Sequence, residues 1–314
     1  IIIMFKKISK ITVKQIKTFN KTSNWFKILV ALLVVLFLFH LFTTKKESFV
    51  QKKKFIVKEN TAVYDKFYSE IYDDLIFDKV KNEYEVGEII NITHPTNESR
   101  ILDIGSGTGE IVSLFNKKGY KAEGIDISPA MIKRSHEKYP QLKFLEGDMT
   151  KSIHFQSNSF THITSLYFTI YYIKNKLQFF QNCYDWLMPG GSLVIHLVNR
   201  DKFDPILNVA DPLVWVSPQK YAKKRITSSL VKFKDFQYKA NFDFYKEKNL
   251  AEFTETMTDD KTKNVRKNIH NLYMPTQKKI LAMAKNVGFI LKGKIDLVNV
   301  QYEYQYLYIL YKPE

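Results

Sequence analysis

A short apolar run that ends in three alternating glycines constrains this chain more than any other feature. Residues 101–104 are followed by Gly105, Gly107 and Gly109, and helical apolar spacing begins directly after them at Glu110. This pattern predicts a strand, a tight turn and the start of a helix. Glycines let the backbone approach a ligand closely because they carry no Cβ, and the first helical turn offers unpaired N–H groups. We therefore expect a nucleotide-like ligand on this turn.

Acidic residues follow two further predicted strands. Asp126 ends the strand predicted over 120–126, and Asp148 follows the strand predicted over 142–146. A carboxylate at the first position can accept both hydroxyls of a ribose, and one at the second can accept a hydrogen bond from an adenine amino group. A lone acid at a strand end is commonly a solvated loop residue. Three in register, with Asp103 before the glycine turn, favour a nucleotide site instead.

The glycine spacing is Gly-x-Gly-x-Gly, whereas the dinucleotide fingerprint is Gly-x-Gly-x-x-Gly. With Asp103 two residues before the first glycine, the pattern resembles that of the class I S-adenosylmethionine-dependent methyltransferases. Residues 128–132 and 188–195 are similar to that family's second helix start and its turn into the fifth strand. The resemblance implies that Asp103 and the glycine turn hold the methionine part of the cofactor, Asp126 the ribose and Asp148 the adenine. The residues expected to bind S-adenosylmethionine are Asp103, Gly105, Ser106, Gly107, Gly109, Asp126, Ile127, Met131, Asp148, Met149 and Ser165.

The resemblance also implies an α/β fold with a doubly wound, seven-stranded, mostly parallel sheet. This domain is expected over 61–314, with strands near 289–300 and 302–311 closing the sheet as a terminal hairpin. Residues 201–275 leave the alternation of strands and helices, and their own period of two predicts antiparallel strands. We expect them to form a β-rich lid insertion over the acceptor site, where variable loops on a rigid scaffold set specificity.

The N-terminal segment predicts a membrane anchor. Residues 25–42 are almost wholly apolar and just long enough to span a bilayer, between a basic tail over 1–24 and a linker over 43–60. A retained single-pass anchor is preferred to a cleaved signal peptide or an interfacial helix, because no small-residue cleavage site follows. Residues 1–59 contribute +11 of the net charge of +16, which favours a membrane surface over nucleic acid as the partner. Lysines are nearly balanced across the span, so the cytosolic placement of the domain rests on where the cofactor is made.

The acceptor site is expected at the carboxyl end of the strand over 160–166, beside the reactive methyl group. Tyr167 is one candidate for catalysis and His196 is the other, although a mid-strand position makes a core histidine an alternative for the latter. The further aromatic candidates for this site or for cofactor contact are Tyr171 or Tyr172, and Tyr64 or Tyr72 from a leading helix. Cys183 is the single cysteine, so no disulfide framework and no cysteine-based metal site is possible, and no metal is expected.

These features predict a membrane-anchored methyltransferase that acts on a small-molecule or lipid-like acceptor, with its catalytic domain facing the cytosol. Three alternatives stay open: a protein or RNA methyltransferase, a non-catalytic scaffold that binds S-adenosylmethionine, and an NAD-dependent reductase. The weakly basic character of the domain itself argues against nucleic acid. The sequence leaves the acceptor and the oligomeric state open.

Overall fold

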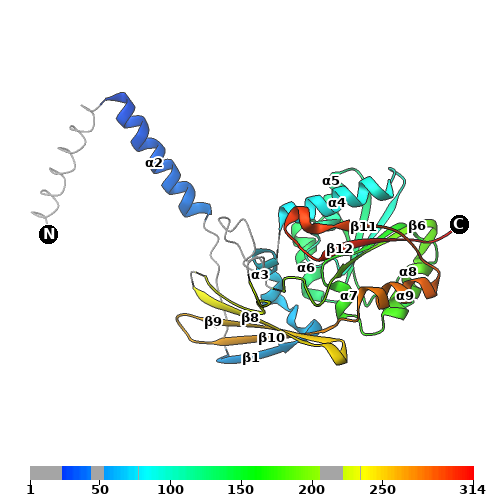
Figure 1. Ribbon diagram of the computed structural model, residues 1–314. Helices are drawn as coiled ribbons and strands as arrows, with labels where there is room; N and C mark the ends of the chain where they lie inside the picture. The colour runs from blue at the N-terminus through cyan, green and yellow to red at the C-terminus, as the bar shows by residue number, and fades with distance from the viewer. Residues whose placement is uncertain (1–22, 44–52, 77, 206–221, 234) are drawn as a thin grey trace, which may run out of the picture. The chain divides into compact units, whose positions relative to one another are not determined.

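The computed structural model describes residues 23–43, 53–76, 78–205, 222–233 and 235–314 (Figure 1). The chain divides into two compact units, Ile1–Ser48 and Phe49–Glu314. The first contains helix α2 (Asn24–Thr43), which covers the span predicted over 25–42. Among the described residues, however, no helix combines the length and the apolarity needed to cross a membrane. The transmembrane part of the predicted fold therefore lacks structural support, and most of the basic tail over 1–24 lies outside the described residues.

The second unit is built on a seven-stranded sheet with the order β11-β12-β6-β5-β2-β3-β4. The five strands from β6 to β4 run parallel, whereas β12 is antiparallel to β6 and β11 is antiparallel to β12. The predicted doubly wound sheet and its terminal hairpin are thus confirmed. The bounds are β2 (Arg100–Ile104), β3 (Lys121–Asp126), β4 (Lys143–Glu146), β5 (Phe160–Ser165), β6 (Leu187–Val198), β11 (Ile290–Asp296) and β12 (Gln305–Tyr311).

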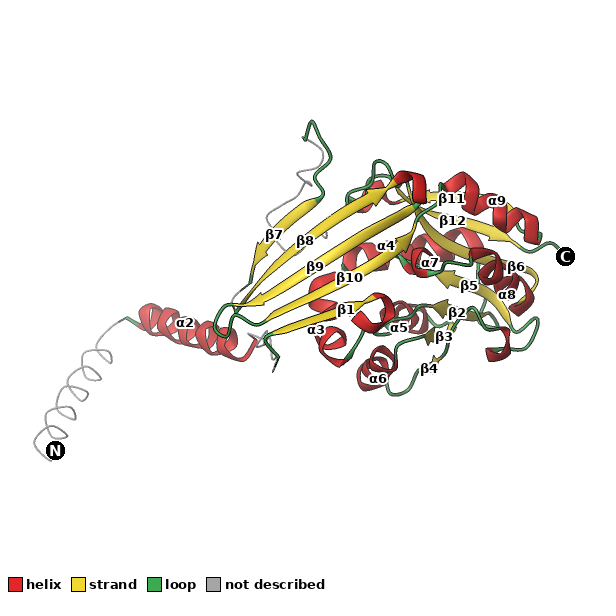
Figure 2. Ribbon diagram, turned by 90° about the horizontal axis from the view of Figure 1, so that it is seen from below, coloured by secondary structure: helices red, strands yellow, loops and turns green. Residues whose placement is uncertain are grey.

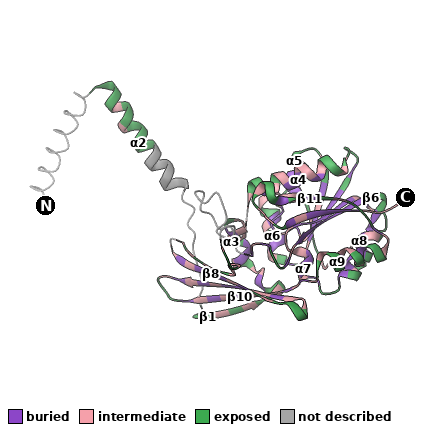
Figure 3. Ribbon diagram, in the orientation of Figure 1, coloured by how far each residue is buried: buried purple, intermediate pink, exposed green. Residues whose placement is uncertain are grey.

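Helices cover both faces of this sheet, as an apolar parallel sheet requires. Side chains of α8 and α9 join the strands in one hydrophobic cluster, and side chains of α4 and α5 join them in another. The buried strands between these helical layers are visible in Figure 3. The helices are α3 (Lys66–Ile76), α4 (Lys79–Thr93), α5 (Glu110–Lys117), α6 (Pro129–Lys138), α7 (Thr169–Tyr172), α8 (Lys176–Trp186) and α9 (Gln277–Val287), with short 3₁₀ turns η1 (Asn60–Val63), η2 (Ser152–His154), η4 (Lys246–Lys248) and η5 (Leu297–Val300).

Local sequence explains where several helices begin and end. The Ser128 hydroxyl accepts a hydrogen bond from the Met131 amide, and Pro129 occupies the first turn of α6. Thr276 caps α9 in the same way, and Gly288 ends that helix with a positive φ of 119°. The cap at Ser128 agrees with the helix start expected there.

A second sheet, with the order β1-β10-β9-β8-β7, lies alongside the first (Figure 2). Four of its strands come from the insertion predicted over 201–275, which confirms its β-rich character: β7 (Ser228–Lys232), β8 (Phe236–Tyr245), β9 (Leu250–Asp259) and β10 (Val265–Tyr273). The fifth, β1 (Phe55–Glu59), pairs parallel to β10. The prediction of a linker over 43–60 is therefore wrong at its carboxyl end. Phe55–Glu59 forms a strand that hydrogen-bonds to the edge of β10.

Helix α3 lies between the second sheet and α6. Its buried side chains share a hydrophobic cluster with Met131 of α6 and with Tyr238 and Met257 of the second sheet. Tyr68 and Leu75 of α3 are buried in this cluster, so the helix contributes mainly to the core. The second half of α3 lies against the glycine turn that follows β2, where Tyr72 is next to Gly107 and Asp73 is hydrogen-bonded to Thr108.

Candidate functional site

The glycine turn has the left-handed backbone that only glycine adopts without strain. The φ angles are 73° at Gly105, 54° at Gly107 and 88° at Gly109. Space is also limited, because a Cβ on Gly105 would lie 2.5 Å from the methyl group of Thr169. A Cβ on Gly109 would lie 2.6 Å from the Phe144 ring. The turn therefore requires glycine for conformation and for close packing, and Gly105 and Gly107 line a cavity in front of it.

Asp103 ends β2 and faces this cavity from a buried position. Its Oδ1 accepts a hydrogen bond of 2.7 Å from the Thr164 hydroxyl on the neighbouring strand β5. Burial raises the pKa of Asp103 to about 7, although the Thr164 hydrogen bond opposes the shift. Asp103 forms no ion pair with any residue that the structure describes, and such a buried acid is suited to a positively charged ligand group, such as the amino group of an amino acid.

Asp126 ends β3 and holds the glycine turn. Its Oδ2 accepts from the Gly107 amide at 2.9 Å, and its Oδ1 accepts from the Ser128 amide at 2.8 Å. Burial raises the pKa of Asp126, and these backbone hydrogen bonds act in the opposite direction. Both oxygens keep lone pairs that a ligand hydroxyl can use, so the side chain can bind a ribose without leaving the turn.

Most of the residues predicted to bind the cofactor share one cavity of about 410 Å³. Asp148 lies at its edge and accepts from the Thr150 amide and hydroxyl at 2.9 and 2.7 Å. The Ser106 hydroxyl is buried and has no partner among the described residues, as expected of a group that awaits a ligand. The predicted residues that line the cavity are Asp103, Gly105, Ser106, Gly107, Asp126, Ile127, Met131, Asp148 and Met149.

Three predicted residues, Gly109, Ser165 and His196, do not line the cavity. Ser165 is fully buried at the end of β5, because its side chain points into the sheet packing. His196 is also fully buried, and its Nδ1 makes a short hydrogen bond to the Tyr167 carbonyl. Burial lowers the pKa of His196 to about 3, and the nearby Lys81 lowers it further. The prediction that His196 is a catalytic base is therefore wrong. His196 is a core histidine, which was the alternative.

Tyr167, the other catalytic candidate, does line the cavity. It has a φ of 52°, an uncommon conformation for a residue with a side chain, which turns it out of β5. The Lys81 ammonium lies 5.3 Å from its ring centroid, and this lysine forms a buried ion pair of 2.9 Å with Glu85. The Lys81–Glu85 pair was not predicted from the sequence. Burial raises the pKa of Tyr167 well above its usual range, so its hydroxyl stays protonated.

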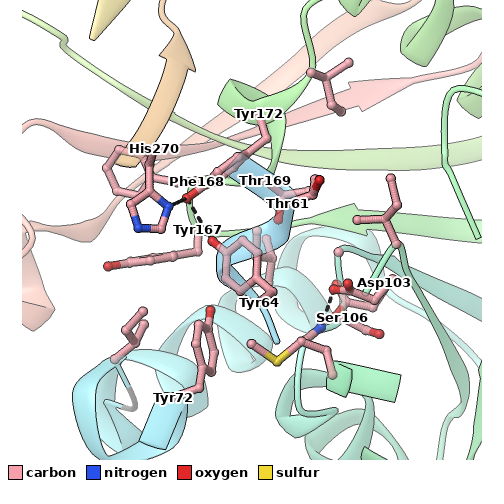
Figure 4. A pocket seen from close by; sticks show the side chains of 18 of the residues that line it. Thr61, Tyr64, Tyr72, Asp103, Ser106, Tyr167, Phe168, Thr169, Tyr172 and His270 are labelled. Atoms are coloured by element: carbon pink, nitrogen blue, oxygen red, sulfur yellow. Dashed lines mark hydrogen bonds between the residues drawn. The ribbon is translucent and has the colours of Figure 1, made fainter. Parts of the chain in front are cut away.

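Aromatic rings form the cavity wall opposite the glycine turn (Figure 4). Tyr64 and Tyr72, both expected from the leading helix, contact each other with ring centroids 6.2 Å apart. Tyr172 also lines the cavity, whereas the Tyr171 hydroxyl accepts from the Val198 amide inside the core. The structure thus decides between the two neighbouring tyrosines in favour of Tyr172.

Helix α3 is fastened to the glycine turn by a polar network. Asp73 of α3 accepts from the Thr108 hydroxyl at 2.6 Å and from the Lys138 ammonium at 2.7 Å. The Ser128 hydroxyl donates to the backbone carbonyl of Tyr64 at the start of this segment. The leading segment is therefore held over the turn at two points.

Sequence reasoning missed His270 and Glu255. His270 of β10 lines the cavity, and its Nε2 lies 2.9 Å from Oε2 of Glu255, which is fully buried on β9. The missed signal is the alternation in β10, where Arg266, Asn268 and His270 occupy the buried positions. Polar residues at the inward positions of a strand indicate a built polar site. Among the described residues, no group of acids, histidines and cysteines could hold a metal ion.

Comparisons with known proteins agree with this geometry. Residues 102–195 match the family model described as a methyltransferase domain. The demethylmenaquinone methyltransferase of Chlorobaculum tepidum is 34% identical over 99 residues, which cover 31% of this chain and 40% of that protein. The phosphoethanolamine N-methyltransferase of Plasmodium falciparum is 33% identical over 114 residues, covering 34% of this chain and 42% of that protein. This chain thus spans about two fifths of the length of these curated relatives.

Solved structures share the fold at low identity. The CcbJ methyltransferase from Streptomyces caelestis superposes with a TM-score of 0.64 at 12% identity, covering 81% of this chain and all of that one. A methyltransferase from Clostridium acetobutylicum superposes with a TM-score of 0.61 at 15% identity, covering 79% of this chain and 98% of that one.

The sheet order, the glycine turn and the acids after β2, β3 and β4 define a class I S-adenosylmethionine-dependent methyltransferase fold. Within it, residues 102–195 form the methyltransferase domain proper, and S-adenosylmethionine is the cofactor of this class. The family and the cofactor expected from the sequence are confirmed.

Proposed function

We propose that this chain is an S-adenosylmethionine-dependent methyltransferase that methylates a small-molecule or lipid-like acceptor. One observation carries the proposal: the glycine turn and the three acids open into the same cavity as a wall of aromatic side chains. A cofactor on the turn would therefore present its reactive group to an acceptor held against that wall.

The residues present fit this cofactor. Asp103, Asp126 and Asp148 lie at or next to the ends of three adjacent strands, and the cavity is also lined by Ser106, whose hydroxyl has no hydrogen-bond partner among the described residues. Acidic side chains outnumber lysines in the cavity wall, which suits a sulfonium cation. When bound, the cofactor supplies an activated methyl group with its own leaving group. The protein's task is then to position a nucleophile in line with the methyl group and to exclude water.

The character of the acceptor follows from the opposite wall. The aromatic side chains of this wall present large apolar faces, and the tyrosines among them add hydroxyl groups. They are Tyr64, Tyr72, Tyr172, Phe168 and Phe253. Such a wall suits a small aromatic or aliphatic molecule. The two curated relatives named above carry small-molecule acceptors in their names, which is consistent with this choice.

We also propose membrane association through residues 25–42, on the strength of their sequence alone. The test is fractionation of cells that express the full chain or a form lacking 1–48. Recovery of the full chain in the membrane fraction, and of the shortened form in the supernatant, is the expected result. Equal recovery of both forms in the supernatant would remove the membrane from the proposal.

The cofactor site is tested by calorimetry of S-adenosylmethionine binding to the full chain. Asp126→Asn keeps an oxygen for the Gly107 amide but removes the charge that a ribose would use, so affinity should fall about 10- to 100-fold. Asp243→Asn is the matched control, because Asp243 is exposed on β8 outside the cavity. A folded wild-type chain that binds NADH and not S-adenosylmethionine would overturn the proposal in favour of a reductase.

A further inference from the structure

We infer that His270, oriented by Glu255, takes the acceptor's proton through Tyr172 and Tyr64, and that the acceptor is a protic nucleophile, an amine or a hydroxyl. The inference rests on the proposed methyl transfer and adds its proton path. These four side chains come from the leading segment, α7, β9 and β10, and they form one continuous line of hydrogen bonds.

The buried end of the line is a carboxylate. Glu255 is fully buried and accepts from Tyr68 at 3.1 Å, from Tyr238 at 2.7 Å and from Asn268 at 3.1 Å, in addition to His270. Four donors thus converge on the two oxygens of this buried side chain, an arrangement that favours the ionised carboxylate over the acid. An ionised carboxylate only accepts hydrogen bonds, so His270 Nε2 must carry a hydrogen.

The tautomer of His270 then fixes the direction of the whole line. With its hydrogen on Nε2, a neutral imidazole has a lone pair on Nδ1. The Tyr172 hydroxyl lies 2.7 Å from Nδ1 and therefore donates to it. The Tyr64 hydroxyl donates in turn to the Tyr172 oxygen at 2.8 Å. Both tyrosine hydroxyls therefore donate in the direction of His270, which is the arrangement that carries a proton inward.

The outer end of the line lies in the cavity on the cofactor side. Figure 4 shows Tyr64 between His270 and the pair Asp103 and Ser106. The backbone carbonyl of Tyr64 is bonded to Ser128, which also contacts Asp126. The oxygen of Tyr64 donates its hydrogen to Tyr172 and keeps lone pairs for an acceptor's N–H or O–H. Because Tyr64 and the glycine turn line the same cavity, an acceptor held in that cavity can reach the Tyr64 oxygen.

The step balances without a further reactant. The acceptor's lone pair forms a bond to the methyl carbon, and the carbon–sulfur bond breaks with its electron pair on sulfur. The acceptor's proton passes to Tyr64 as the Tyr64 proton passes to Tyr172 and the Tyr172 proton to His270 Nδ1. Both tyrosines end neutral, and the imidazolium is stabilised by the Glu255 carboxylate. The ionisable groups facing His270 are Tyr64 and Tyr68 of the α3 segment, Tyr172 of α7 and Glu255 of β9.

The first test measures the tautomer and needs no acceptor. The full chain is labelled with ¹⁵N-histidine, and two-bond ¹⁵N–¹H spectra are recorded between pH 6 and 9. His270→Gln assigns the signal, because glutamine can still donate to Glu255 but cannot take a proton. We expect the neutral form of His270 to carry its hydrogen on Nε2. A neutral form with the hydrogen on Nδ1, or an imidazolium that persists to pH 9, would overturn the inference.

The second test measures methyl transfer to three aromatic probes of matched size: catechol, benzylamine and nicotinamide. The first two must lose a proton, whereas the nicotinamide ring nitrogen has a free lone pair. We expect His270→Gln and Tyr172→Phe to lower kcat with the protic probes about 10²- to 10⁴-fold and to flatten the rise of rate with pH, at unchanged cofactor affinity. Transfer to nicotinamide alone, equal in wild type and His270→Gln, would overturn the inferred acceptor class.

Tyr171→Phe is the matched control for Tyr172→Phe. It lies on the same short helix and loses one hydrogen bond, but its side chain points into the core. Its pH profile should keep the wild-type shape. An equal flattening in both variants would show that the hydrogen-bonded line is structural and does not carry the acceptor's proton. Failure of the wild type to bind S-adenosylmethionine would instead remove the proposed function. The tautomer measurement decides the state of His270 whether or not a probe reacts.

Discussion

At the residue scale, the buried carboxyl group of Asp103 lowers the stability of the folded protein when no cofactor is bound. Its pKa is raised by burial to about 7, whereas the unfolded chain releases this proton near pH 4. Between these values the folded state binds the proton more tightly, so the contribution of this residue to stability falls as pH rises from about 4 to 7 and then levels off. A ligand cation beside the carboxylate would reverse this penalty, which couples stability to cofactor binding.

Asp103→Asn should therefore stabilise the empty protein while it weakens the cofactor site. The free energy of unfolding should rise by about 1–3 kcal/mol at pH 8 and by less at pH 5, because the penalty removed is larger at high pH. Urea unfolding at both pH values measures this change, and calorimetry should show at least about tenfold weaker S-adenosylmethionine binding. A gain that is the same at both pH values would contradict the assigned origin.

Gly105→Ala tests the close packing of the glycine turn. The new Cβ would meet Thr169 at 2.5 Å in a backbone with a φ of 73°, so strain and collision add. Gly119→Ala is the matched control, because its φ of 91° is equally unfavourable but no atom lies within 4 Å of the new Cβ. Thermal unfolding should show a loss of about 1 kcal/mol for the control and about twice that or more for Gly105→Ala. Equal losses would show that conformation alone matters.

At the scale of elements, helices and strands were predictable where the sequence pattern that defines them is short-range. The strand, turn and helix around Gly105 and the strand ends at Asp126 and Asp148 follow from short-range patterns, and all three form as expected. Strand β10 was missed because its buried face carries Arg266, Asn268 and His270 in place of an apolar stripe. These buried polar residues are explained by strand pairing, which brings Glu255 of β9 opposite Asn268.

The same reasoning explains the error at β1. Residues 55–59 pair with residues 265–269, about two thirds of the chain away. The sequence of these five residues carries no signal that identifies the strand with which they pair. Long-range pairing of this kind, and not local propensity, also assembles Tyr64, Tyr172 and His270. The cofactor half of the site was therefore predictable from sequence, whereas in the acceptor half the tyrosines were candidates but His270 and Glu255 were missed.

Helix α3 should control how long the cofactor stays bound. Asp73→Asn removes the carboxylate that joins Thr108 after the glycine turn to Lys138 of α6. The pair is partly exposed, so stability should fall by only about 0.5–1 kcal/mol, but S-adenosylmethionine should dissociate several-fold faster in stopped-flow displacement. Asp74→Asn, one residue along and exposed, removes the same charge without touching the turn. If both variants release the cofactor at the same rate, the Asp73 contacts of α3 do not slow its dissociation.

At the scale of the whole molecule, the compact unit Phe49–Glu314 includes β1 as part of its second sheet. A fragment over 60–314 therefore leaves the edge of β10 unpaired, whereas a fragment over 49–314 keeps it covered. We expect the shorter fragment to unfold about 5 °C lower and to aggregate more readily, since an open strand edge recruits other chains. Scanning calorimetry and light scattering measure the two effects. Identical melting of both fragments would show that β1 contributes little.

The parallel pairing of β1 with β10 also has a mechanical consequence. The chain enters the compact unit from Ile1–Ser48 through β1, so tension on that N-terminal segment reaches β1 before it reaches the rest of the domain. The strand beside β1 carries His270, the residue that we place at the end of the proton path. A pull on the N-terminal segment would thus load the strand next to the reaction centre, and the rate of the enzyme would become sensitive to force.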